Sequence, residues 1–198
     1  MESLTRINDN FLESLIEDVV DTKDIQSAKQ LLYNLKEPTP LLVDAINLCI
    51  AQHDGQFRKS GEPYAIHPIL VACFVAFMGG DYAMVISALL HDVVEDTGTT
   101  LDQVEDTDFS IEQVEQRFGG EVSKIVEGLT KIVNIREDKL APSSDSNAKL
   151  RTTALTFRRM LMISINDQRV LVVKLCDRLH NMLTLDALRP DKQKRIGE

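Results

Sequence analysis

Four ionisable residues stand within six positions of one another in the middle of the chain, directly after an apolar segment. His91, Asp92, Glu95 and Asp96 follow the segment YAMVISALL at 82–90. In an α-helix, His91 and Glu95 stack on one side, and Asp92 and Asp96 stack on the adjacent side. Three acids at the end of a buried helix need cations, hydrogen-bond donors or a metal, because an unpartnered buried carboxylate costs several kcal/mol.

The simplest alternative is a helix that ends in solvent with a charged tail, and the histidines argue against it. The chain has four histidines, and three occur in the pairs His67-Pro68, His91-Asp92 and His180-Asn181. The fourth, His53, lies at a predicted helix end, where we expect a partner of the helix dipole or a surface group. Polar groups that several helices point into one core commonly build a metal site.

A second polar face is predicted near the C-terminus. Asp177 and Asn181 are four residues apart and Thr184 follows three residues later, so they share one face of a helix. Taken singly, each residue also has a structural explanation. His67 could be a core histidine bonded to a carbonyl, and Asp177 could form a salt bridge with Arg178. The metal hypothesis is preferred because independent segments each supply the required residue type.

Apolar residues at helical spacing run through most of the chain. Thr39 before Pro40 is typical of a helix start, and Ser110 with Gln113 predicts a capping box. The run 170–173, VLVV, taken alone also fits a strand, but the apolar pattern continues to Leu185 and favours a helix. The predicted helical segments are 11–20, 25–35, 40–53, 67–78, 82–97, 111–118, 122–129, 150–165 and 170–185.

These segments predict an all-α fold, a single domain of about eight to ten helices close to a bundle. We expect residues 1–40 to form a helical segment packed on the main domain, 41–198. The loops 56–63 and 137–148 have polar composition. Phe74, Phe77, Met160 and Met162 are predicted to be core residues.

Composition narrows the class of protein. The 198 residues carry a net charge of −9, which argues against a nucleic-acid-binding surface. No stretch is long and apolar enough to span a membrane, and no signal peptide is apparent. Cys49, Cys73 and Cys176 lie apart in apolar surroundings and predict buried free thiols in a reducing compartment. We expect a soluble, cytoplasmic protein, with no membrane or nucleic-acid partner, whose anionic ligands need a local basic patch.

Three motifs in order carry a resemblance to a known family: RKSGEPYAIHP at 58–68, HDVVEDT at 91–97 and KLCDRLHNMLTL at 174–185. With FGGEVSKIVEGLTKI at 118–132 and LRPDKQKRI at 188–196, the chain resembles the hydrolase domain of the RelA/SpoT family, a branch of the HD phosphohydrolase superfamily. The similarity covers roughly residue 42 to the C-terminus.

This resemblance implies that His67, His91, Asp92 and Asp177 hold one divalent metal, normally Mn²⁺. Such a mixed nitrogen and oxygen set suits Mn²⁺ and would also accept Zn²⁺ or Fe²⁺. Glu95 and Asp96 match the acidic pair that positions and deprotonates the attacking water. The implied nucleotide-binding residues are Arg58, Lys59 and Ser60 in the basic loop, and Asn181 and Thr184 near the sugar and base.

The implied substrate is the alarmone (p)ppGpp, whose 3′-pyrophosphate is removed to leave GDP or GTP, which ends the stringent response. Two alternatives stay open: a phosphohydrolase of another 2′- or 3′-phosphorylated nucleotide, and a non-catalytic nucleotide-binding regulatory module. The intact ligand set and acidic pair argue against the second alternative.

Two features depart from the family pattern. Extra residues occur at 102–109 and 137–148, near segments that flank the expected site. Long family members continue from the RPDKQKRI stretch into a synthetase domain, which is absent here, so we expect an excised hydrolase domain or a stand-alone hydrolase.

Overall fold

The computed structural model describes residues 9–58, 60–95, 109–137, 158, 162 and 167–184. Within these residues the fold is all-α, as predicted, and the one β-type pairing is an isolated antiparallel bridge between Phe57 and Pro63. The helices of the described part of the chain are α1 (Asp9–Asp21), α2 (Ile25–Leu35), α3 (Pro40–Gln52), α4 (Ile66–Phe77), α5 (Tyr82–Glu95), α6 (Ile111–Phe118), α7 (Gly120–Glu137) and α9 (Gln168–Leu183).

The helix boundaries follow the local signals of the sequence. The side chain of Asp24 caps α2 by accepting a hydrogen bond from the backbone N–H of Ser27. Thr39 caps α3, with Pro40 at its first position. Ser110 and Gln113 form the predicted reciprocal capping box of α6. These caps satisfy N–H groups that have no partner inside the helix.

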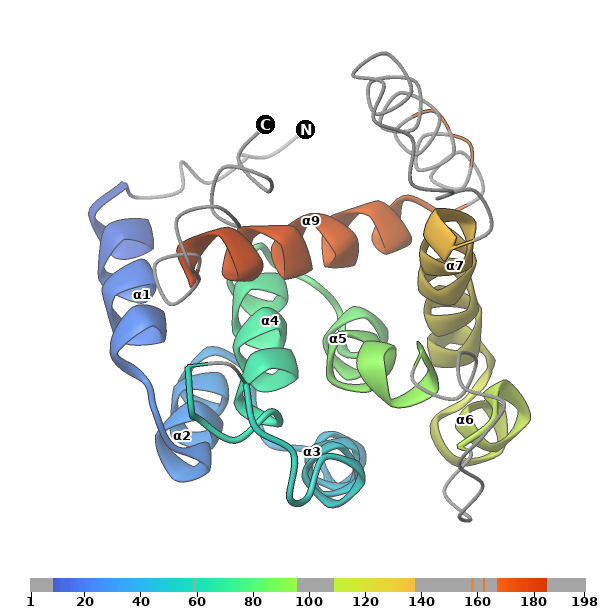
Figure 1. Ribbon diagram of the computed structural model, residues 1–198, viewed down its shortest axis with the longest axis horizontal. Helices are drawn as coiled ribbons and strands as arrows, with labels where there is room; N and C mark the ends of the chain where they lie inside the picture. Colours follow the sequence, from blue (N-terminus) through green and yellow to red (C-terminus); the bar gives the residue numbers. More distant parts are fainter. Residues whose placement is uncertain are drawn as a thin grey trace.

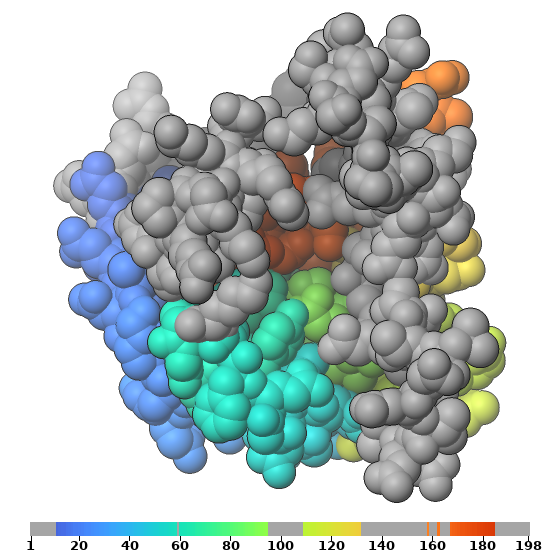
Figure 2. All heavy atoms as spheres, in the orientation of Figure 1, coloured from blue at the N-terminus to red at the C-terminus, as the bar shows by residue number. Residues whose placement is uncertain are grey.

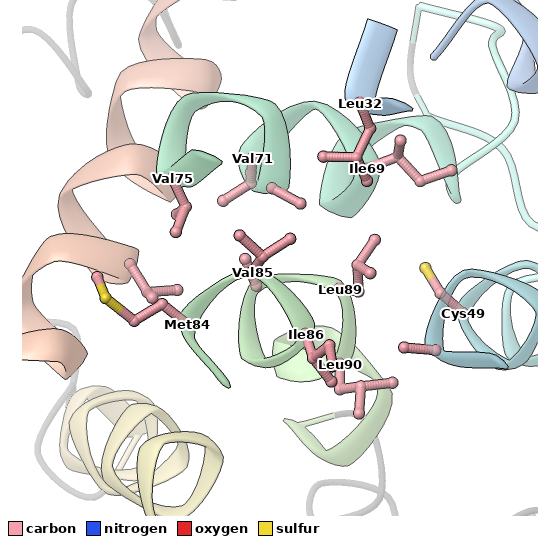
Figure 3. Packing of buried hydrophobic residues seen from close by; sticks show 14 of the residues in the cluster. Leu32, Cys49, Ile69, Val71, Val75, Met84, Val85, Ile86, Leu89 and Leu90 are labelled. Atoms are coloured by element: carbon pink, nitrogen blue, oxygen red, sulfur yellow. The ribbon is translucent and has the colours of Figure 1, made fainter. Parts of the chain in front are cut away.

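Helices α4 and α5 form the centre of the molecule (Figure 1). Helix α4 packs against α2, α5 and α9, while α5 also packs against α3 and α7. Figure 3 shows Val71 and Val75 of α4 facing Val85 and Leu89 of α5. Since nearly every side chain of α4 is buried, neighbouring helices fix its orientation on all sides.

Helix α9 crosses α4 and reaches α7 (Figure 1), so it joins the two sides of the molecule. The segment 170–173 is helical, which confirms the prediction over the strand alternative. Gly128 of α7 permits the close approach, because a Cβ at that position would lie 2.7 Å from Cγ2 of Val170. Helix α9 therefore packs closely against both α4 and α7.

The N-terminal helices share the hydrophobic core of the rest of the described chain. Leu32 of α2 lies beside Ile69 of α4 (Figure 3), and Leu15 and Val19 of α1 belong to the same cluster. The three cysteines are buried and free, as predicted. In the part of the chain that the structure describes, no helix is both long and apolar enough to cross a membrane.

Some predictions fall outside the described residues or are wrong. The end of the central helix beyond Glu95, nearly all of the predicted helix 150–165 and almost all of both extra segments are not described. Phe74 is buried and Phe77 packs against the core, but the side chain of Met162 is 56% exposed, so its assignment to the core is wrong.

Candidate metal centre

Three helices bring the predicted metal ligands to one place. His67 is the second residue of α4, His91 and Asp92 lie in the last two turns of α5, and Asp177 lies in the second half of α9. Figure 2 shows atoms of α5 and α9 at the centre of the face that is also formed by the loop between α3 and α4. His67, His91 and Asp177 are at most 6% exposed.

The distances fit a single small cation. One potential ligand atom each from His67, His91 and Asp92 lie within 4.8 Å of one another. Oδ1 of Asp177 is 3.3 Å from Nε2 of His67 and 3.9 Å from Nε2 of His91. The structure thus assembles two imidazoles and two carboxylates, a mixed donor set that suits a divalent transition metal.

The hydrogen bonding of His91 tests whether these residues fit a metal. Its Nδ1 lies 2.7 Å from the carbonyl oxygen of Ala88, so this nitrogen carries the proton and donates it. Nε2 lies only 2.9 Å from Oδ1 of Asp92 and finds no hydrogen-bond partner among the described residues. An unprotonated Nε2 and the carboxylate oxygen would repel each other, so a cation must lie between them, either a second proton or a metal ion. In metal sites the other ring nitrogen of a ligating histidine is usually hydrogen-bonded, as Nδ1 of His91 is here.

The electrostatics also favour a cation. Burial opposes a charge on His91, but Asp92 outweighs this effect and raises the pKa of His91 to about 9. Burial opposes the charges of Asp92 and Asp177 as well, yet the nearby histidines and Lys174 hold the pKa of both carboxyl groups well below the usual range. Burial lowers the pKa of His67. Two ionised carboxylates thus attract a cation, either a proton on His91 or a metal ion.

Two residues that hold these carboxylates were missed by the predictions from sequence. The hydroxyl of Tyr64 donates to Oδ2 of Asp92 at 3.1 Å. Nζ of the buried Lys174 is 3.0 Å from Oδ2 of Asp177. Both residues lie inside the motifs RKSGEPYAIHP and KLCDRLHNMLTL. Only the spacing of Lys174, three positions before Asp177 on the same helix, gave a signal for contact.

Of the five predicted nucleotide-binding residues, Arg58 and Asn181 contact the cluster of predicted metal ligands. A guanidinium N–H of Arg58 donates to Oδ1 of Asn181 at 2.9 Å, and Nδ2 of Asn181 donates to Oδ1 of Asp177 at 2.7 Å. These two side chains therefore border the metal centre. Thr184 follows α9, and its hydroxyl donates to backbone oxygens of His180 and Asn181. Ser60 lies exposed in the loop, and Lys59 is outside the described residues.

The predicted catalytic acids remain predictions. Glu95 is the last residue of α5, one helical turn after His91. Its side chain and the whole of Asp96 lie outside the described residues.

His53 departs from one of its predicted roles. It follows the last residue of α3, as expected for a helix end, but it is 3% exposed and is not a surface group. Its Nδ1 lies 3.0 Å from Oε1 of Gln56, and its ring packs 4.8 Å from the ring of Tyr64. The ring of His53 therefore packs against Tyr64, whose hydroxyl donates a hydrogen bond to Asp92.

Comparison with known proteins identifies the family of the chain. A family model described as HD domain matches residues 45–198. Over 145 residues, the chain is 45% identical to the bifunctional (p)ppGpp synthase/hydrolase SpoT of Escherichia coli K12, covering 73% of this chain and 18% of that protein. Over 160 residues, it is 45% identical to a probable guanosine-3′,5′-bis(diphosphate) 3′-pyrophosphohydrolase of Synechocystis, covering 81% of this chain and 19% of that protein. A probable GTP pyrophosphokinase of Mycobacterium leprae is 39% identical over 151 residues, which are 76% of this chain and 16% of that protein.

The chain therefore belongs to the HD domain family and carries an HD domain of the RelA/SpoT type, as its motifs predicted. It spans less than a fifth of the length of these curated relatives. An HD domain implies a divalent metal, and the cluster of His67, His91 and Asp92 offers a place for one.

Proposed function

We propose that the protein hydrolyses the 3′-pyrophosphate of (p)ppGpp to give GDP or GTP and pyrophosphate. The observation that carries the proposal is the cluster of His67, His91 and Asp92, with Asp177 beside it, in a chain 45% identical to proteins named for this reaction. Water attacks the phosphorus attached to the 3′ oxygen, and the bond between them breaks. The nucleotide leaves with its 3′ oxygen, which takes up a proton to become a hydroxyl, and the attacked phosphorus is released as part of pyrophosphate.

In this proposal His67, His91, Asp92 and Asp177 hold one divalent cation, and Mn²⁺ is the cation that we infer. When bound, such a cation would lower the pKa of water toward neutrality and offset the negative charge of the oxygens on the phosphorus under attack. Glu95 or Asp96 takes the proton from the attacking water, a role typically associated with a factor of ~10² to 10⁴ in rate.

We assign nucleotide binding to the loop 56–63 and to the C-terminal end of α9. Arg58, Lys59 and Ser60 contact the nucleotide, while Asn181 and Thr184 lie near its sugar and base. A protein with a net charge of −9 needs such local positive charge to hold a highly anionic ligand. Arg58 is the described cation of this loop, and its contact with Asn181 supports the assignment.

We also infer the cellular compartment and a partner domain. Three buried free cysteines fit a reducing compartment such as the cytoplasm. Because the Escherichia coli relative is named a bifunctional synthase/hydrolase and is much longer, we propose a synthetase domain as a partner of this domain.

A product assay tests the function. The purified protein is stripped with chelator and given ppGpp with and without Mn²⁺, and the products are separated by ion-exchange chromatography. We expect GDP and pyrophosphate only when metal is present, and neither product from the variant Asp177→Asn. Loss of a 5′ phosphate, or equal turnover in chelator, would contradict the proposal.

A further inference from the structure

His180 is a buried histidine that the proposed reaction does not use. It lies on α9, three positions after Asp177, and is 2% exposed. Its ring centroid is 4.8 Å from that of His67. Nδ1 of His180 lies 2.8 Å from Nδ1 of His67 and 3.2 Å from a terminal guanidinium nitrogen of Arg58.

These two short distances favour one assignment of the ring protons. A guanidinium group has only donors, so Nδ1 of His180 accepts the hydrogen bond from Arg58 and carries no proton itself. Nδ1 of His67 lies 2.8 Å from the same nitrogen, and we assign it as a second donor that shares the single lone pair there, because two facing lone pairs would repel. This assignment places a proton of His67 on Nδ1 and leaves Nε2 for the cation that must lie between it and the carboxylates.

The free nitrogen of His67 points to the cluster of carboxylates. Nε2 is 3.3 Å from Oδ1 of Asp177 and 3.7 Å from Oδ2 of Asp92. This is the nitrogen that a metal would need in its unprotonated form. In His91 the carbonyl of Ala88 enforces the same choice of nitrogen.

Arg58 reaches both sides of the centre through neighbouring residues of α9. One guanidinium nitrogen bonds His180, which bonds His67, and another bonds Asn181, which donates to Asp177. A single loop residue thus orients two of the four predicted ligands.

We propose that His180 is a positioning residue that fixes Nε2 of His67 as the metal-binding nitrogen, with Arg58 holding His180 in its accepting form. This inference rests on the proposed metal centre. It assigns His180 no contact with substrate or metal.

Paired substitutions of His180 test the role. His180→Leu fills the buried space but removes the acceptor, whereas His180→Asn keeps an acceptor oxygen close to the position of Nδ1. Val173→Ala is the matched control, because it removes a buried contact from α9 without touching the polar network. Circular dichroism and thermal denaturation verify that each variant folds.

The first readout is Mn²⁺ affinity, measured by isothermal titration calorimetry. Loss of an outer hydrogen-bond partner of a ligating histidine typically weakens metal binding about 10- to 100-fold. We expect this loss for His180→Leu, and affinity close to wild type for His180→Asn and Val173→Ala. Unchanged affinity in His180→Leu would overturn the inference while leaving the proposed function intact.

The second readout needs no metal and no activity. Long-range nitrogen-15 NMR of the metal-free wild-type protein, which has only four histidines, reports the protonated nitrogen of each ring. The carboxylates near Nε2 of His67 attract a proton in the metal-free protein, and the acceptor on His180 opposes this. We therefore expect a larger fraction of His67 protonated at Nδ1 in wild type than in His180→Leu. Equal fractions of the Nδ1-protonated form in wild type and His180→Leu would overturn the inference. A wild-type protein that binds no divalent metal would overturn the proposed function and this role of His180 together.

Discussion

The hydroxyl of Tyr64 donates a hydrogen bond to Oδ2 of Asp92 across 3.1 Å, joining residues 28 positions apart in the chain. Tyr64 belongs to the loop before α4, and Asp92 belongs to the end of α5. The bond leaves Oδ1 of Asp92 facing Nε2 of His91, so the loop orients a predicted ligand that lies on another element.

Substituting Tyr64 by Phe tests this orientation. The change removes the hydroxyl but keeps the ring that packs on His53. We expect the free energy of unfolding to fall by about 1 kcal/mol, and Mn²⁺ affinity to fall by about tenfold, the lower end for loss of an outer partner. Calorimetric titration and urea denaturation measure the two effects.

The control for this substitution is Tyr82→Phe, which removes a hydroxyl that donates to the carbonyl oxygen of Glu37 at the same distance, 3.1 Å. We expect a smaller loss of stability from the control, because its hydrogen bond is exposed to solvent, and unchanged metal affinity. Equal loss of metal affinity in both variants would rule out an orienting role for Tyr64.

Lys174→Met is expected to destabilise the metal-free protein strongly. Nζ of Lys174 is 3.0 Å from Asp177, and both side chains are at most 8% exposed. Removing one partner of a buried ion pair leaves a charge uncompensated and costs about 3 kcal/mol or more. A bound cation would compensate the remaining carboxylate, so saturating Mn²⁺ should recover part of this loss.

Thermal denaturation with and without Mn²⁺ measures this recovery. Lys131→Met is the control, since Lys131 pairs with Glu127 on the exposed surface of α7 and its loss should cost less than about 1 kcal/mol. If Mn²⁺ raises the melting temperature of Lys174→Met no more than that of wild type, then the carboxylate of Asp177 does not bind the metal.

The stability of the metal-free protein should depend on the protonation of the centre. The folded-state pKa of His91, about 9, lies above its ordinary value of 6.5, so its stabilising contribution is complete below pH 6.5 and is lost as the pH rises through 9. His67 and His180 have lowered pKa values, caused first by burial, and they therefore destabilise the fold as the pH falls below their ordinary value of 6.5. We expect maximal stability near pH 6.5 in chelator.

Urea denaturation across this range, with chelator and with Mn²⁺, measures the dependence. Because a metal competes with the proton on His91, the stabilisation by Mn²⁺ should grow as the pH rises from 6.5 to 9. A stabilisation by Mn²⁺ that stays constant over this range would show that His91 is not a ligand.

Asp96→Ala should separate catalysis from metal binding. If Asp96 acts as the base, its removal lowers kcat by a factor of ~10² to 10⁴, while Mn²⁺ affinity stays near wild type because the four predicted ligands remain. Glu95→Ala, assayed in parallel, identifies which of the two acids takes the proton. Loss of metal affinity in Asp96→Ala would contradict the proposed division of roles.

Much of the fold could be predicted from the sequence because its signals are local. Capping residues such as Thr39 and Ser110 act on N–H groups within three positions, so they mark helix starts without knowledge of the tertiary structure. The apolar period likewise indicated that 170–173 is helical. The exposed Met162 was not predictable in this way, because an apolar residue in a helical pattern has no local signal for which face is covered.

By itself, the sequence determined the helices and the candidate ligands, since His91 and Asp92 are neighbours and the motifs name His67 and Asp177. The tertiary structure alone decided how those ligands are held. Tyr64 reaches Asp92 and His180 reaches His67, 113 positions away, only because α4, α5 and α9 pack together. Hydrogen-bond direction depends on which atoms lie within about 3 Å of each other, and no spacing along the chain specifies that distance between separate helices.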